Sequence, residues 1–163
     1  MKLLIFTEGT IIMHKTAIGC SREDIVEQVK NKQESVHDYN SYVPIGNAIN
    51  KLQYWRKYGA EIFYLTSRRK PEEIKQIRNV LTKFKFPEGQ FLFRQKNEEY
   101  KDIVEKIIPD ILIEDNCESI GGEKEMAITH VMSKIKKKIK SIIIKEFRGI
   151  DILPDNLKDL ISY

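Results

Sequence analysis

The chain has 163 residues, 28 basic and 24 acidic side chains, a net charge of +4, and 41% hydrophobic residues. This length and balance predict one globular domain that buries its own core, and they exclude a disordered chain. Two distant cysteines argue against a disulfide framework or a zinc site, and no apolar run is long enough for a signal peptide or a membrane span, so we expect a cytoplasmic protein with no membrane partner.

The first strand ends abruptly in polar residues. An apolar run from Leu3 to Phe6 stops at Thr7-Glu-Gly-Thr10, which is typical of a buried parallel strand that brings a carboxylate and a glycine turn to the carboxyl edge of a sheet. Residues 11–44 then form an insertion longer than an ordinary loop, which we interpret as a small cap or lid over that edge. Within it, Ser21 and the acidic residue three positions later predict a helix over 21–32.

Strands and helices alternate along the rest of the chain. The patterns predict a helix over 45–58, a strand over 60–65, a helix that begins at Pro71, and a strand over 90–93. Asn97 is the expected cap of a helix over 98–108, and a fourth strand follows over 110–115. We expect residues 121–140 to be mostly helical, then a fifth strand over 141–147 and a short helix over 154–161. This order predicts an α/β protein with a doubly wound, parallel, five-stranded sheet.

Three of the expected strands end in residues that suit a cation and a phosphate. These ends carry Glu8, the pair Thr66-Ser67, and the pair Glu114-Asp115. If the three strands lie together at the middle of the sheet, their ends share one crevice, which is where open α/β sheets bind ligands. Carboxylates suit Mg²⁺, while hydroxyl groups and free backbone N–H groups hold phosphate oxygens. Lys101, on the helix before the fourth strand, could neutralise remaining negative charge.

These residues resemble the motifs of a known family. Leu3-Leu-Ile-Phe-Thr-Glu-Gly-Thr10, Tyr64-Leu-Thr-Ser67, a helical Lys101, and Asp110-Ile-Leu-Ile-Glu-Asp115 are similar, in this order, to the four motifs of the haloacid dehalogenase-like (HAD) superfamily. The resemblance covers nearly the whole chain and is nearest to the 5′-nucleotidase-like and magnesium-dependent phosphatase branches. It places residues 11–44 where that family has its first cap.

The resemblance also implies roles for individual residues. It implies that Thr66 and Ser67 bind phosphate and that Lys101 is a catalytic and phosphate-binding lysine. Glu8 takes the place of the family's general acid and base. The same resemblance implies that Glu8, Glu114 and Asp115 hold Mg²⁺, with weaker binding than in a complete site.

The first motif departs from the family at its central position. The family has Asp-x-Asp-Gly-Thr, in which the first aspartate attacks phosphorus. Aligning Gly9-Thr10 places Glu8 at the second aspartate and Phe6 at the first, and Phe6 can neither attack phosphorus nor bind a metal. A register that makes Glu8 the nucleophile would break the Gly9-Thr10 match. We therefore expect aspartyl-phosphate chemistry to be absent or impaired.

The expected function is binding of a small phosphorylated, nucleotide-like molecule together with Mg²⁺. Two alternatives stay open. One is an active metal-dependent phosphohydrolase that uses Glu8 or a metal-bound water, and the other is a non-catalytic interaction or nucleic-acid-binding module. We do not expect a nucleic-acid partner, because the lysines of residues 134–140 alternate with Ile135 and Ile139 as on a solvated helix face. The sequence makes no prediction of the oligomeric state.

Overall fold

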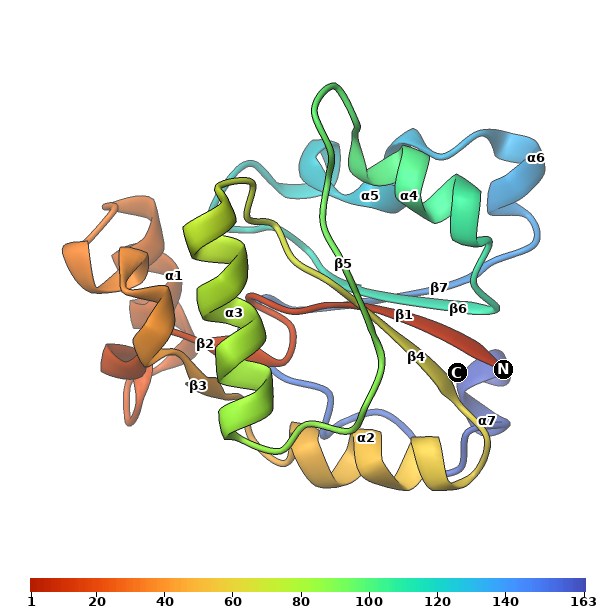
Figure 1. The fold of residues 1–163 in the computed structure, drawn as a ribbon, viewed down its shortest axis with the longest axis horizontal. Coiled ribbons are helices and arrows are strands. Elements are labelled where there is room, and N and C mark those ends of the chain that lie inside the picture. Colours follow the sequence, from red (N-terminus) through yellow and green to blue (C-terminus); the bar gives the residue numbers. More distant parts are fainter.

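A parallel sheet forms the centre of the computed structural model, which describes residues 1–163. Its strand order is β5-β4-β1-β6-β7 (Figure 1). The strands, in that order, are Gln90–Leu92, Glu61–Leu65, Lys2–Phe6, Ile111–Asp115 and Lys140–Ile144, and each pairs in parallel with its neighbour. The expected doubly wound, five-stranded α/β sheet is confirmed. The first strand lies between the second and the fourth, as the three-strand site requires.

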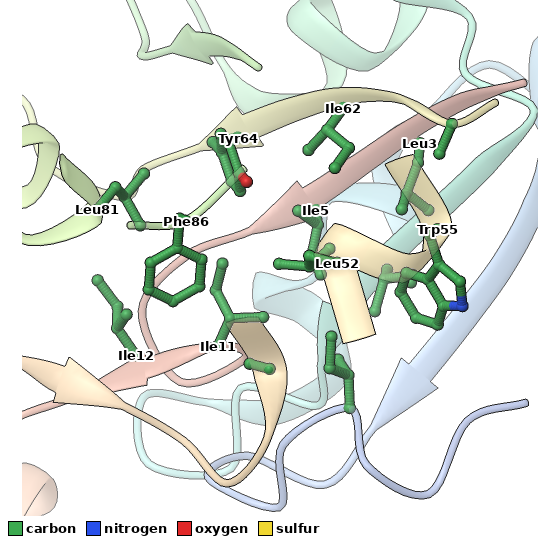
Figure 2. Packing of buried hydrophobic residues seen from close by; sticks show 14 of the residues in the cluster. Leu3, Ile5, Ile11, Ile12, Leu52, Trp55, Ile62, Tyr64, Leu81 and Phe86 are labelled. Carbon is green, nitrogen blue, oxygen red and sulfur yellow. The ribbon is translucent and has the colours of Figure 1, made fainter. Parts of the chain in front are cut away.

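Helices cover both faces of the sheet because side chains alternate along each strand. Leu3 and Ile5 of β1 face the layer of α2 (Ala48–Lys57) and α3 (Pro71–Lys83), where Leu52 and Trp55 are fully buried (Figure 2). Leu4 and Phe6 face the opposite layer, which contains α4 (Tyr100–Ile107) and α5 (Ala127–His130). Strand β1 is therefore buried on both faces.

The C-terminal segment closes the larger core. The indole N–H of Trp55 donates to the backbone oxygens of Pro154 and Asp155, at 3.2 and 3.0 Å. Leu160, in the last helix α7 (Asp159–Ser162), is fully buried in the same cluster. No helix of the structure has both the length and the apolar character needed to cross a membrane.

Residues 11–44 form a small substructure of their own beside the sheet (Figure 1). They contain a two-stranded antiparallel sheet and short helices: β2 (Ile12–Met13), η1 (Lys15–Ala17), α1 (Arg22–Lys30), η2 (Glu34–His37), η3 (Tyr39–Ser41) and β3 (Val43–Pro44). Ser21 caps α1 by accepting from the backbone N–H of Asp24 at 3.1 Å, so the expected helix start is confirmed. The η3 turn packs against α3.

Three helix predictions differ from the structure, and the first is the last helix, which covers only Asp159–Ser162 instead of 154–161. Glu99, rather than Asn97, caps α4 through a reciprocal pair of bonds with Asp102, and Asn97 has a positive φ of 65°. Residues 121–140 do not form a long helix but three short ones, η4 (Gly122–Glu125), α5 and α6 (Ser133–Lys136). Met126 and Val131 are extended and buried at the breaks, so packing against the sheet overrides local helix propensity there.

Candidate anion pocket at the carboxyl edge

The strand ends open into one pocket of about 280 Å³. Its lining includes Phe6 at the end of β1 and Glu8 after it, Ser67 and Arg68 after β4, and Asp115 at the end of β6. Residues of the 11–44 insertion also line it, among them Val36, Tyr39 and Tyr42. The structure thus brings together the ends of the three strands that the sequence singled out.

Glu8 lies in this pocket with both carboxylate oxygens engaged. Oε1 accepts from the Thr66 hydroxyl at 2.6 Å, and Oε2 accepts from the Ser67 backbone N–H at 3.1 Å and the Thr7 hydroxyl at 2.6 Å. The Arg68 Nε lies 3.4 Å from Oε1, and only 11% of the Glu8 side chain is exposed. The hydroxyl and N–H groups that the sequence assigned to phosphate therefore hold a carboxylate of the chain itself.

Arg68 supplies the positive charge next to Glu8. Its guanidinium donates to the hydroxyl groups of Tyr39 and Ser67 and lies over the Tyr39 ring at 4.7 Å. Tyr39 belongs to the insertion, so Arg68 joins this segment to the sheet edge. The half-buried place of Arg68 beside Glu8 favours a part in the pocket.

Phe6, which the sequence resemblance aligns with an attacking aspartate, is the last residue of β1. Its ring is nearly buried and meets Tyr100 of α4 edge-on, with centroids 5.1 Å apart. Burial raises the pKa of Tyr100 to about 12, so this hydroxyl stays protonated. Neither ring offers an attacking group at neutral pH.

Asp115 and Glu146 form a second acidic element of the pocket. Asp115 accepts from the Thr10 hydroxyl at 3.1 Å and the Cys117 N–H at 2.8 Å, whereas Glu146 accepts from the N–H and hydroxyl groups of Ser119 at 2.7 and 2.6 Å. Burial and the nearby charge of Glu146 together raise the pKa of Asp115 to about 7. Both side chains are nearly buried, and burial also raises the pKa of Glu146.

Gly9 allows this close packing. Its φ is +77°, and a Cβ at this position would lie 2.8 Å from the Asp115 Oδ2. A side chain would therefore push the carboxylate away from its hydrogen-bond donors.

Glu114 points away from the other carboxylates. Its oxygens accept from the backbone N–H groups of Ala127 and Ile128, at 2.7 and 3.0 Å, at the start of α5. Burial raises its pKa to about 7. The Glu114 side chain points away from Asp115 because adjacent residues of β6 face opposite sides of the sheet. Glu114 thus anchors a helix in this structure.

Lys101 lies outside the pocket. Its ammonium group is exposed and pairs with Glu99 at 3.1 Å, and it is not among the residues that line the pocket. The cation that reaches Glu8 is Arg68 instead.

The carboxylates expected to hold Mg²⁺ do not fit that ion as they are placed here. No group of three or more His, Cys, Asp or Glu side chains is arranged to hold a metal. Glu8 is engaged with four donors, and the oxygens of Glu114, which also lines the pocket, are engaged with the N–H groups at the start of α5. Mg²⁺ needs several oxygen ligands around one point.

Glu146 was not predicted as a site residue, although its position along the chain indicates one. It follows β7 in the same way as Glu8 follows β1, so it belongs to the same edge of the sheet. Tyr39 carried no such signal, because residues 33–44 show no clear periodicity that would place its side chain.

The strand order, the polar strand ends and the insertion after the first strand define a doubly wound α/β fold with a parallel five-stranded sheet. The structure is similar to the class C acid phosphatase from Bacillus anthracis with tungstate bound, with a TM-score of 0.56 and 14% sequence identity over 91% of this chain and 68% of that chain.

A second similar structure is the D,D-heptose 1,7-bisphosphate phosphatase from Burkholderia thailandensis, with a TM-score of 0.47 and 9% identity over 90% of this chain and 93% of that one. No protein-family model matches the sequence, and no curated protein matches it either. At 14% identity, the likeness to the acid phosphatase supports the fold and leaves the activity to the residues of the site.

Proposed function

We propose that this protein binds a small phosphorylated, nucleotide-like molecule at the carboxyl edge and does not hydrolyse it through an aspartyl phosphate. The observation that carries the proposal is the convergence of three donors, the Thr66 hydroxyl, the Ser67 N–H and the Arg68 guanidinium, on the carboxylate of Glu8. Groups that hold a carboxylate also suit phosphate oxygens, because both are anionic acceptors. The ligand phosphate would displace Glu8 from these donors.

The absence of hydrolysis follows from Phe6 and Glu8. Phe6 has no atom that can attack phosphorus, and the Glu8 carboxylate is already bound by four donors, so it is poorly placed to take a proton from water. Members of a catalytic unit fail together, so loss of the attacking group alone lowers the rate by several orders of magnitude.

Mg²⁺ has no part in this proposal, because the carboxylates do not converge on one point. We assign the phosphate contacts to Thr66, Ser67 and Arg68, and the closure of the pocket to the cap formed by residues 11–44. We also propose a cytoplasmic location, because Cys20 and Cys117 are both free thiols.

Binding is tested by calorimetry with adenosine monophosphate and with adenosine as the phosphate-free control. Thr66→Val keeps the shape of the side chain and removes the donor, so we expect it to weaken monophosphate binding about tenfold. Thr10→Val removes an equally buried hydroxyl that donates to Asp115, and we expect a much smaller effect. Equal binding of adenosine and its monophosphate would refute phosphate recognition.

Turnover is tested with an aryl phosphate, with and without Mg²⁺. We expect no turnover by the wild type and none by Phe6→Asn, and a gain of activity in Phe6→Asp would show that the pocket lacks only the attacking group. Robust wild-type turnover that Glu8→Gln abolishes would overturn the proposal and establish the active phosphohydrolase.

A further inference from the structure

A second pocket, of about 460 Å³, lies between the first turns of α3 and the segment that follows β5. Nine residues line it, and five of them are cationic: Arg69, Lys75, Arg78, Arg94 and Lys96. None of the nine is acidic. It shares no lining residue with the pocket around Glu8, so the two sites are separate.

The charges of this basic pocket are not neutralised within the chain. None of its five cations takes part in any ion pair of the structure; the nearby Glu73 pairs with Lys70 instead. Arg94 lies over the Tyr100 ring at 3.8 Å and donates to the Ser67 backbone oxygen at 3.3 Å, but its buried Nε has no hydrogen-bond partner. A buried donor without an acceptor is costly and favours a bound acceptor.

The cations also repel one another. Burial lowers the pKa of Arg94, and the charges of Arg69 and Arg68 act in the same direction, whereas Tyr100 and Glu99 act against it. An anion bound between them would relieve this repulsion. The positive charge is local, because Glu72 and Glu73 lie between Arg69 and Lys75 along the chain and Glu98 and Glu99 follow Lys96.

We propose that the basic pocket binds a small ligand that carries a chain of two or more phosphate groups. The cations come from both walls of the pocket, so one phosphate group cannot meet them all, whereas linked phosphates can. The volume lies within the usual range for small-molecule sites. The acidic residues near these cations, Glu72, Glu73, Glu98 and Glu99, favour a compact ligand over a long nucleic-acid strand, because the backbone of such a strand would run past them.

The test measures the binding of inorganic tripolyphosphate by calorimetry at fixed ionic strength. The triple variant Lys75→Gln, Arg78→Gln and Lys96→Gln removes three exposed charges and leaves Arg94 in place. Each exposed contact to a phosphate contributes a factor of about two to five, so we expect the triple variant to bind at least about tenfold more weakly.

The matched control removes three exposed lysines elsewhere, by Lys134→Gln, Lys137→Gln and Lys138→Gln, with the same change of net charge. We expect this control to bind tripolyphosphate within about twofold of the wild type, because ionic screening weakens distant charges. An equal loss in both triple variants, or no binding by the wild type, would overturn the proposal.

Two further probes define the ligand. Orthophosphate that binds as tightly as tripolyphosphate would overturn the requirement for linked phosphates. A single-stranded oligonucleotide that binds more tightly and loses affinity in the first triple variant would replace the small ligand with nucleic acid. Thr66→Val should leave tripolyphosphate binding unchanged, so this inference and the proposed function can fail separately.

Discussion

Replacing Glu8 by alanine removes the acceptor on which the pocket donors converge. The Thr7 hydroxyl keeps a second acceptor in the Leu65 backbone oxygen at 3.3 Å, and Arg68 keeps Tyr39 and Ser67. The Thr66 hydroxyl and the Ser67 N–H lose their only acceptor. Each unsatisfied buried donor costs about 1–2 kcal/mol, so we expect the free energy of unfolding to fall by about 2–4 kcal/mol.

Phosphate should restore this loss in the variant, because it can take the place that the carboxylate leaves. With a Kd of about 1 mM, 100 mM phosphate would add about 2.7 kcal/mol of stability. The assay is urea unfolding followed by the fluorescence of Trp55, the only tryptophan and fully buried, in phosphate and in chloride of equal ionic strength.

Glu88→Ala is the control, because Glu88 makes an exposed ion pair with Arg56. It corrects for the general stabilisation of folded proteins by phosphate and for binding elsewhere on the chain. If phosphate stabilises Glu8→Ala no more than this control, or if Glu8→Ala loses no stability in chloride, the Glu8 carboxylate does not occupy an anion site and the reasoning is refuted.

Three further predictions concern the pocket and its surroundings. Burial raises the pKa of Asp115 and of Glu114 to about 7, so in the folded chain both keep protons that the unfolded chain releases near pH 4. The free energy of unfolding should therefore fall as the pH rises from about 4 to about 7, by on the order of 4 kcal/mol for Asp115, and should level off above pH 7. Urea unfolding across this range should show that the free energy of unfolding depends less steeply on pH in Asp115→Asn. An unchanged pH dependence would contradict a raised pKa for Asp115. Gly9→Ala forces a side chain into a positive φ and against Asp115, so we expect a loss of about 2 kcal/mol or more by thermal unfolding, and a neutral effect would disprove the close contact. Tyr39→Phe removes the hydroxyl that accepts from Arg68 but keeps the ring under its guanidinium, so a loss of about 1 kcal/mol in urea unfolding is expected, and no loss would show that this bond does not hold the insertion.

The meeting of Glu8, Thr66 and Ser67 could be predicted because it depends on topology. An apolar run that stops at a polar residue marks the carboxyl end of a buried strand, and parallel neighbours end at the same edge. Asp115 reaches the same pocket for this reason. From the sequence, Glu114 and Asp115 had the same expected role. In the structure, the alternation of side chains along β6 places the Glu114 carboxylate on the other face of the sheet, at the start of α5.

The sequence by itself determined the order of the strands and the α/β class, because these depend on local periodicity and residue type. Only the tertiary structure decided what each polar group meets. It placed the Glu8 carboxylate on the donors of Thr66 and Ser67, and it left Arg94 and its neighbours without counter-ions. Hydrogen bonds and charge interactions between distant segments depend on separations of a few ångströms, which no spacing along the chain specifies.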